Sequence, residues 1–332
     1  MPTLRDIGED GLLARLRPLL AEHTAGLLLG TGDDCAITQP DPRRLVWTID
    51  AMVEGAHFRF WPGNSPRAVG WKLAASNLSD LASKGATPLY ALLSAGFPGD
   101  ADADAVVALH EGVAECLAEH GARLIGGDTV RAPQWTLSLT LVGALAPGAA
   151  LATRSRARPG MTVYCTGHPG ESGAGFRALE EGRGADFPAL AERHLRPRPR
   201  VAIGRALVEA CSDLAMLDCS DGPAKDASRV AAASSVRVVL ESALFPISPA
   251  LADFAAQTGS SAEDLFLFGG EDYELLFATA ADFATIHQAA REAEPAVSVT
   301  AIGRVEEGEG LCLEGPDGSR VDLLSRKGFE HF

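Results

Sequence analysis

The stretch that most restricts the fold is WTLSLTLVG, residues 135–143. In it, Leu137, Leu139 and Leu141 alternate with polar residues. A period of two is typical of a β-strand with one buried face, and one-sided burial is a property of antiparallel sheets. We therefore expect a mainly antiparallel sheet in the N-terminal half of the chain.

The remaining pattern predicts a mixture of helices and strands. Helices are expected over residues 6–20, 66–85, 102–120, 172–183, 199–212, 222–235, 248–258 and 281–293, and strands over 26–30, 45–50, 89–97, 122–127, 162–167, 214–218, 236–241, 273–279, 297–303 and 311–314. Glycine turns are expected to follow the strands that end at Gly127 and Gly167. The fold class is therefore α/β, of the α+β type.

A domain boundary is expected in APGAALATRSRARPG, because proline and glycine interrupt the periodic pattern there. It divides the chain into an N-terminal domain, residues 1–148, and a C-terminal domain, residues 149–332. A length of 332 residues is sufficient for two domains with cores of their own.

Charge and composition exclude several classes of protein. The net charge of −15 argues against nucleic-acid binding, which needs clustered Lys and Arg. No run of about 18 apolar residues predicts a membrane span, and the acidic start MPTLRDIGEDGLL predicts no signal peptide. The six cysteines form no CxxC pair, so we expect a reduced, cytoplasmic protein without a zinc site.

Carboxylates recur where apolar segments end. They are Asp33 and Asp34 in GTGDDCA, Asp50, Asp80, Asp128, Asp218, Asp221, Glu271 and Asp272. Singly, each has an ordinary explanation, such as a solvated turn, an ion pair of Asp80 with Lys84, or a helix cap at Asp128. Together they predict several Mg²⁺ ions around one cleft, because Mg²⁺ bridges protein carboxylates to substrate phosphates.

Any nucleotide site in this chain must be of an unusual type, because the known nucleotide-binding motifs are missing. There is no Walker loop and no protein-kinase motif, and TGHPGESGAG, residues 166–175, is not a Rossmann fingerprint. Basic residues are still needed to hold phosphates. The candidates are Arg131, Arg154, Arg156 and the arginines of HLRPRPR, residues 194–200.

Eight segments in a fixed order carry a family resemblance: GTGDDCA, TIDAMVEGAHF, NLSDLASKGATP, LIGGDTVR, ATRSRARPG, HLRPRPR, LDCSDG and FGGEDYELLF. Over nearly its whole length, the chain resembles thiamine-monophosphate kinases, which belong to the superfamily of aminoimidazole ribonucleotide synthetase. The resemblance implies ATP-dependent phosphorylation of thiamine monophosphate to thiamine diphosphate with several Mg²⁺ ions, and K⁺ is a further candidate. It also implies a homodimer whose N-terminal sheets pair into a barrel, a C-terminal α/β sandwich domain, and an active site in a cleft between the domains.

The resemblance also assigns roles by position. The implied metal positions are Asp34, Thr48, Ile49, Asp50, Asp80, Asp128, Asp218 and Asp221. Those that would touch ATP are Gly127, Asp128, Arg154 and Ser220, with Arg154 and Asp128 as the catalytic residues. The implied contacts of thiamine phosphate are His57, Glu271 and Phe329. Ile49 departs from the family's usual Thr and could offer a metal only its backbone carbonyl.

The expected mechanism is direct in-line transfer, because the acceptor is a phosphate monoester whose oxygen is already largely ionised at neutral pH. No general base and no phosphoenzyme are then needed. Three alternatives remain open: a sister ATP-dependent enzyme of the superfamily, a metal-dependent phosphatase, and a nucleotide-binding protein without turnover.

Overall fold

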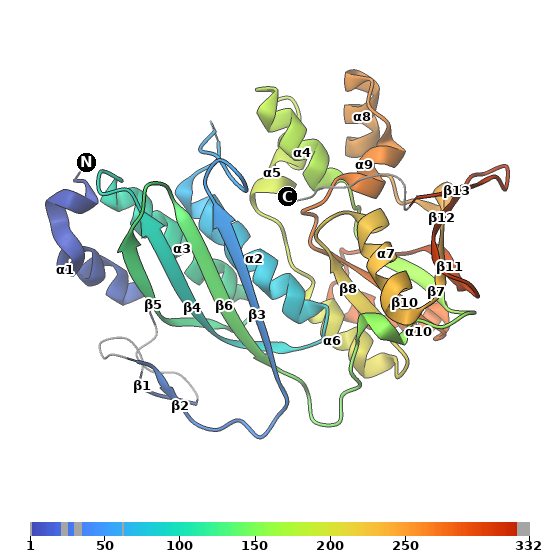
Figure 1. Cartoon of the computed structure of the whole chain (residues 1–332), viewed down its shortest axis with the longest axis horizontal. Coiled ribbons are helices and arrows are strands. Elements are labelled where there is room, and N and C mark those ends of the chain that lie inside the picture. The colour runs from blue at the N-terminus through green and yellow to red at the C-terminus, as the bar shows by residue number, and fades with distance from the viewer. Residues whose placement is uncertain (1, 21–25, 30–34, 62, 324–332) are drawn as a thin grey trace. The chain divides into compact units, whose positions relative to one another are not determined.

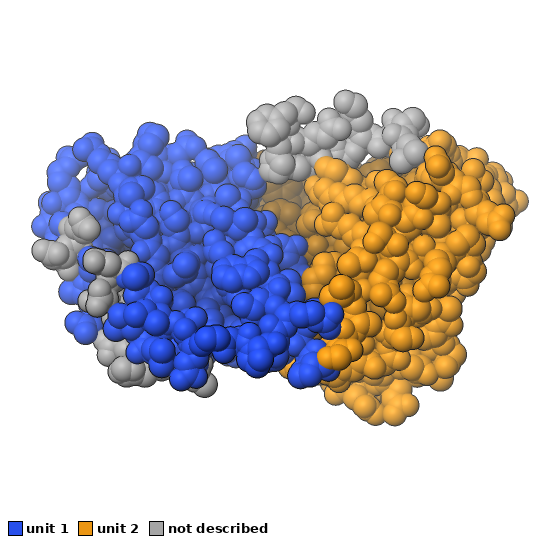
Figure 2. Space-filling view, turned by 60° about the horizontal axis from the view of Figure 1, so that its bottom comes forward, with its two compact units in different colours: residues 1–81, 86–147 blue, residues 82–85, 148–332 orange. Residues whose placement is uncertain are grey.

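The computed structural model describes residues 2–20, 26–29, 35–61 and 63–323. It divides into two compact units, coloured separately in Figure 2. Unit 1 comprises residues 1–81 and 86–147, and unit 2 comprises residues 82–85 and 148–332. Within the described ranges, no helix combines the length and the apolar character that crossing a bilayer requires.

The helices of unit 1 begin at polar residues that satisfy free backbone N–H groups. Thr3 and Asp6 form a capping box, and Asp102 accepts a hydrogen bond from the backbone of Asp104. Ser65 likewise accepts from the backbone of Ala68. A serine followed by proline is a sequence signal for a helix start, in agreement with the helix expected from residue 66. The elements of this unit are α1 (Leu4–Leu16), the 3₁₀ turn η1 (Arg17–Leu19), β1 (Leu27–Leu29), β2 (Ile37–Thr38), β3 (Leu45–Val53), α2 (Pro66–Ala82), β4 (Thr87–Phe97), α3 (Ala103–Glu119), β5 (Arg123–Arg131) and β6 (Thr136–Ala144).

The main sheet of unit 1 has the strand order β3-β6-β4-β5. Strand β6 is antiparallel to both β3 and β4, and only the β4–β5 pair is parallel. The prediction of a mainly antiparallel sheet is therefore confirmed. Helices α2 and α3 lie against one face of this sheet (Figure 1), where Leu137, Leu139 and Leu141 are fully buried.

The predicted glycine turn at the end of β5 is wrong. The strand continues through Gly126 and Gly127 to Arg131 and pairs in parallel with β4. A Cβ atom on Gly127 would lie 2.0 Å from the carbonyl oxygen of Leu93. Glycine is needed here for the close approach of two backbones, not for a turn, so Asp128 lies within a strand and does not cap a helix.

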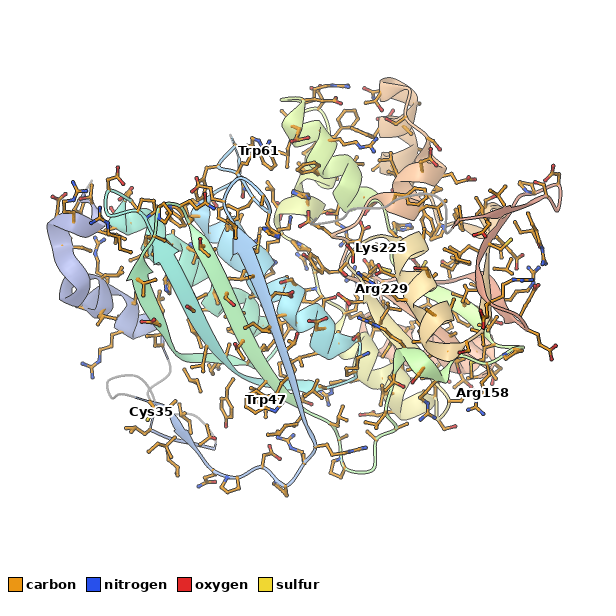
Figure 3. All side chains as sticks on the ribbon, viewed as in Figure 1. Cys35, Trp47, Trp61, Arg158, Lys225 and Arg229 are labelled. Carbon is orange, nitrogen blue, oxygen red and sulfur yellow. The ribbon has the colours of Figure 1, made fainter. Side chains whose placement is uncertain are left out.

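The face of this sheet that α2 and α3 leave uncovered is strongly apolar. Trp47 and Ile49 on β3 are 66% and 65% exposed, Val130 on β5 is 52% exposed and Leu92 on β4 is 46% exposed. Figure 3 labels Trp47 on β3. We refer to this surface, with Thr140 and Val142 of β6, as the outer face. Soluble monomers rarely expose so many large apolar side chains together.

Unit 2 contains more elements than the sequence predicts. It comprises η2 (Arg154–Arg156), β7 (Thr162–Thr166), α4 (Glu171–Glu180), α5 (Pro188–Leu195), α6 (Val201–Ala210), β8 (Ala215–Cys219), α7 (Pro223–Ser234), β9 (Arg237–Glu241), η3 (Ser242–Leu244), α8 (Pro249–Thr258), α9 (Ala262–Phe268), β10 (Glu274–Thr279), α10 (Phe283–Ala293), β11 (Val299–Glu306), β12 (Gly310–Glu314) and β13 (Arg320–Asp322). Helices α5 and α9 were not expected, because each is only about two turns long.

The sheet of unit 2 has seven described strands in the order β13-β12-β9-β11-β7-β10-β8. All pairs are antiparallel except β9 with β12. One face packs its apolar side chains against α7 and α9, and on the other face Tyr164 stacks on Phe277 and on Phe283 of α10. The mixed sheet between helices confirms the α/β class.

Candidate active site

Two carboxylates of unit 1 meet between β3 and α2. The alternation of β3 places Thr48 and Asp50 on the side of the sheet that faces α2, where the Thr48 hydroxyl donates to Asp80 and Ser76 hydrogen-bonds to Asp50. Burial and the nearby charge of Asp80 raise the pKa of Asp50 to about 6, against the effect of Ser76. Two neighbouring, partly buried carboxylates are stable together when a cation neutralises them, and hard oxygen donors fit Mg²⁺.

Asp128 lies elsewhere on the same sheet. It is exposed on β5, in register with Ser94 of β4, and both line a cavity of about 1100 Å³ over the outer face. Asp50 is on β3 at one edge of the sheet and Asp128 is on β5 at the other, with β6 and β4 between them. Three strand spacings separate the edges by roughly 14 Å. One chain therefore cannot bind a single ion with both side chains, and the acids of unit 1 that the structure describes do not gather around one position.

Ile49 is in the same row of the outer face as Thr140 of β6 and Leu92 of β4. Its side chain points away from the Asp50–Asp80 pair, because neighbours along a strand alternate in direction. The suggestion that its carbonyl binds a metal stays a prediction.

In unit 2, β8 ends in the sequence that carries Asp218, Ser220 and Asp221. Asp218 is 5% exposed, and Asp221 is paired with Lys225 at 3.3 Å and with Arg229, both on α7 (Figure 3). Arg229 also pairs with the buried Asp226 at 2.7 Å. Burial raises the pKa of Asp226 to about 7 in spite of Arg229. Sequence reasoning missed both cations, although the i, i+4 spacing of Asp221 and Lys225 is a signal for such a pair.

Glu271 lies next to this segment in a strained backbone. Glu271 and Tyr273 have φ angles of 56° and 52°, a left-handed conformation that non-glycine residues rarely adopt. Their N–H groups donate to the carbonyls of Ser220 at 2.8 Å and Cys219 at 2.9 Å. The Glu271 carboxylate is 3.6 Å from Nδ1 of His194. The structure thus brings Glu271 and Ser220 together, and strain of this kind is common at functional sites.

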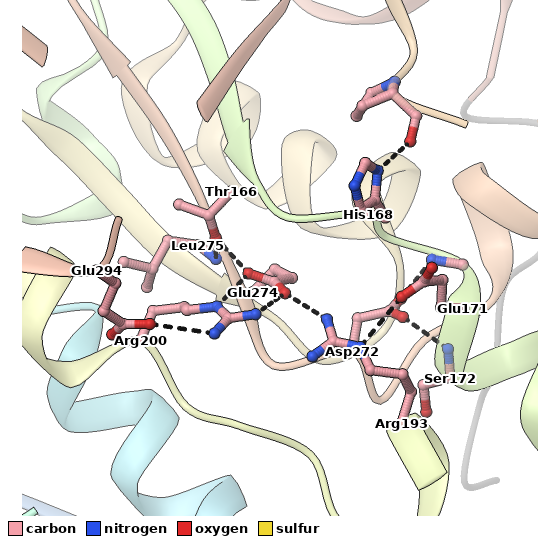
Figure 4. Close-up of polar contacts among 12 residues, drawn as sticks. Thr166, His168, Glu171, Ser172, Arg193, Arg200, Asp272, Glu274, Leu275 and Glu294 are labelled. Carbon is pink, nitrogen blue, oxygen red and sulfur yellow. Dashed lines mark hydrogen bonds and ion pairs between the residues drawn. The ribbon is translucent and has the colours of Figure 1, made fainter. Parts of the chain in front are cut away.

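A buried ion-pair network supports this segment (Figure 4). The carboxylate of Glu274 is fully buried and accepts hydrogen bonds from Arg193, Arg200 and Thr166. Burial alone would raise the pKa of Glu274, but the two arginines outweigh it and lower the pKa to about 2. Arg200 belongs to HLRPRPR and also pairs with Glu294 at 3.2 Å. Its expected role as a phosphate anchor is therefore wrong, because its guanidinium is buried among carboxylates.

The glycine-rich segment before α4 is already bound to a carboxyl group of the protein itself. The buried carboxylate of Asp272 accepts hydrogen bonds from the N–H groups of Gly170 at 2.8 Å and Ser172 at 2.9 Å. Burial raises the pKa of Asp272 to about 7 although both donors favour its charged form. Since the protein's own carboxylate occupies the helix N-terminus, this segment is not a phosphate-binding loop.

Arg154 and His57 have different surroundings. Arg154 is exposed in η2, and its guanidinium has no ion pair or hydrogen bond with the part of the chain that the structure describes. His57 is half-buried, and its Nδ1 accepts a hydrogen bond from the backbone of Val53 at 3.1 Å. Arg154 can therefore reach an anionic ligand without breaking a contact, while one nitrogen of His57 is already used.

Asp34 and Phe329 lie outside the described residues. Within the described ranges, no three His, Cys, Asp or Glu residues are placed to hold one metal ion. Any Mg²⁺ at the Asp50–Asp80 pair would therefore need further oxygen ligands, which substrate phosphates and water commonly supply.

Comparison with known protein families first identifies the class of protein to which the chain belongs. Residues 32–145 match the N-terminal domain of AIR synthase related proteins, and residues 158–314 match the C-terminal domain. The thiamine-monophosphate kinase of Escherichia coli O157:H7 is 36% identical over 339 residues, which span 98% of each chain.

Solved structures agree with this class. The thiamine-monophosphate kinase of Stenotrophomonas maltophilia K279a has a TM-score of 0.79 at 34% identity, covering 93% of this chain and 95% of its own. AaThiL complexed with AMPPCP and TMP has a TM-score of 0.76 at 31% identity, covering 100% and 99%. The chain therefore belongs to the thiamine-monophosphate kinase family, which is a family of enzymes.

Proposed function

We propose that this enzyme transfers the γ-phosphate of ATP to thiamine monophosphate and forms thiamine diphosphate. The observation that carries the proposal is the Asp50–Asp80 pair, which Thr48 and Ser76 orient in a family whose relative was solved with AMPPCP and TMP. Mg²⁺ bound there would neutralise phosphate charge, which is the main requirement of phosphoryl transfer.

The proposed roles follow the family positions. The Mg²⁺ ligands would be Asp34, Thr48, Ile49, Asp50, Asp80, Asp128, Asp218 and Asp221. ATP would contact Gly127, Asp128, Arg154 and Ser220. Thiamine phosphate would contact His57, Glu271 and Phe329. The placement of Glu271 beside Ser220 supports neighbouring binding positions for the two substrates.

This chain's residues would position and neutralise rather than act as a base. The acceptor is a phosphate oxygen that is mostly ionised at pH 7, so no proton needs to be removed. Arg154 would donate hydrogen bonds to the transferred phosphoryl group, where negative charge must be stabilised. Transfer would be direct, without a phosphoenzyme.

The first test measures ADP formation from ATP and Mg²⁺ with and without thiamine monophosphate. The proposal requires turnover that depends on the acceptor. Equal ADP release without the acceptor would instead indicate a phosphatase-like enzyme. No ADP under either condition would indicate a sister activity or a nucleotide-binding protein.

Arg154→Ala is expected to lower kcat by roughly 10²-fold or more, because a preorganised donor to developing charge is lost. Its exposed side chain has no described partner, so the melting temperature should stay close to that of wild type. The matched control is Arg158→Ala, another exposed arginine of the same connecting segment (Figure 3). Equal activity of the two variants would remove Arg154 from the mechanism.

We further propose that the enzyme is a homodimer formed through the outer face. Two observations support this: the apolar side chains exposed there, and the location of Asp50 and Asp128 at opposite edges of one sheet. If two sheets pair at their edges with their outer faces turned toward each other, β3 of one copy lies beside β5 of the other, and Asp50 of one copy can approach Asp128 of the other. Each active site would then contain residues of both copies.

Mixing Asp50→Asn with Asp128→Asn is expected to restore activity that neither variant has alone. After random exchange of subunits, half of the dimers are mixed, and one of their two sites is intact. The expected rate is therefore about a quarter of the wild-type rate. The measurement is ADP formation after joint refolding, with each variant refolded alone as the control. Failure to restore activity in a mixture shown to contain mixed dimers would contradict a shared site.

A further inference from the structure

The turn that carries Arg154 is held in place from several sides. We call residues 152–157 the Arg154 turn. Ser234, at the end of α7, donates its hydroxyl to the carbonyl of Arg154 at 2.7 Å and accepts from the N–H of Ala157 at 3.1 Å. One hydroxyl thus joins both ends of η2. The guanidinium of Arg156 also donates to the carbonyl of Ser212 at 2.7 Å.

Lys84 holds the start of the same turn. Its Nζ donates to the carbonyl of Ala152 at 3.1 Å and to that of Met216 on β8 at 2.9 Å. Residues 82–85 belong to unit 2, so these bonds lie within one unit. Charged donors to carbonyls are among the stronger hydrogen bonds of proteins.

The two elements that hold the turn are the same elements that carry the acids of unit 2. Asp218 lies two residues after Met216 on β8, and Asp221 lies just before α7. Both β8 and α7 pack against η2. The position of Arg154 relative to Asp218 and Asp221 is therefore set by Lys84 and Ser234, while the Arg154 side chain itself stays exposed.

We propose that Ser234, together with Lys84, is a positioning residue that fixes where the Arg154 guanidinium meets the transferred phosphoryl group. This inference rests on the proposed function. A serine hydroxyl that brackets the turn restricts the backbone of Arg154 before any ligand binds. Such preorganisation contributes to rate more than to stability, since misplacing a catalytic group by about 1 Å can cost up to 10²-fold.

The test compares Ser234→Ala with Ser228→Ala. Ser228 is also on α7, and its hydroxyl donates to the carbonyl of Lys225. Ser228→Ala therefore removes one hydroxyl bond to a backbone carbonyl, and Ser234→Ala removes one such bond and also the bond from the N–H of Ala157. We expect Ser234→Ala to lower kcat roughly 10-fold, with a change in KM for ATP no larger than that of Ser228→Ala. Its melting temperature should fall somewhat more than that of Ser228→Ala, because Ser234 also accepts a bond from the buried Ala157. Ser234→Thr keeps the hydroxyl and should retain most of the activity.

A double-mutant cycle separates positioning from a general structural effect. In the Arg154→Ala background, Ser234→Ala should cause no further loss, because it acts through Arg154. An equal further loss, or a Ser234→Ala enzyme as active as Ser228→Ala, would overturn the positioning role while the kinase activity stands. A wild type without turnover that depends on thiamine monophosphate would instead overturn the proposed function, and this inference with it.

Discussion

Asp50→Asn is expected to lower the rate of ADP formation by at least roughly 10²-fold and, without Mg²⁺, to make the fold more stable. The activity falls because, in the proposed mechanism, Asp50 binds the Mg²⁺ that neutralises the phosphates, and this ligand is lost. The stability rises because burial and Asp80 disfavour a charge at Asp50, as its raised pKa shows. Opposite changes in activity and stability distinguish a metal-binding carboxylate from one that only supports the fold.

The pH dependence of stability provides a second test of the prediction for Asp50. The folded-state pKa of Asp50 is about 6, above the ordinary value of 3.8. Its contribution to stability is therefore fully present below about pH 4 and lost as the pH rises through about 6. Urea unfolding of the wild type in EDTA should show this loss, and Asp50→Asn should lack it. The control is Asp100→Asn, which replaces an exposed carboxylate of the same unit. Wild-type turnover of Asp50→Asn would contradict the assignment.

Glu274→Gln is expected to destabilise unit 2 by about 3–5 kcal/mol, because it leaves Arg193 and Arg200 without their shared buried charge. For a domain of this size, the melting temperature should fall by roughly 10 °C. Calorimetry of the wild type and the variant measures the effect. The control is Glu306→Gln, whose partners Arg304 and Arg320 are at the surface, where an ion pair contributes less than about 1 kcal/mol.

Unfolding at acid pH provides a second measurement of how much the Glu274 carboxylate stabilises the fold. The pKa of Glu274 is lowered from 4.5 to about 2, so its contribution is present above about pH 4.5 and lost as the pH falls toward 2. The wild type should therefore lose more stability than Glu274→Gln over this range. If the free energy of unfolding falls equally with pH in the two proteins, the charge of Glu274 does not stabilise the fold through Arg193 and Arg200.

Local patterns in the sequence were sufficient to predict much of the fold. The alternation around Leu139 identified β6, and Ser65 with Pro66 marked the start of α2. Gly126 and Gly127 were misread because the same two residues fit a turn and a close approach of strands. The difference depends on the backbone of β4, about 30 residues away, which no local pattern contains.

The candidate site, too, could be predicted only where local sequence patterns were sufficient. Thr48, Asp50 and Asp80 could be named from their motifs, and the structure brings these three together. The burial of Arg200 could not be predicted, because its partner Glu274 lies 74 residues further along the chain. The separation of Asp50 from Asp128 follows from strand order, which the sequence does not state.

The strand order of unit 2 also decides when a growing polypeptide can fold on the ribosome. Strands β7, β8 and β9 are made first, yet none of them pairs with another. Strand β10 joins β7 to β8, and β11 joins β7 to β9. Unit 1, in contrast, has every strand of its main sheet once Ala144 has emerged. Strand β7, the first of them, must therefore wait for more than 100 residues of synthesis, between Thr166 and Glu274, before its first partner strand is made. Strands β8 and β9 wait for shorter stretches, until β10 and β11 are made. During that interval their apolar side chains are open to aggregation and to chaperones.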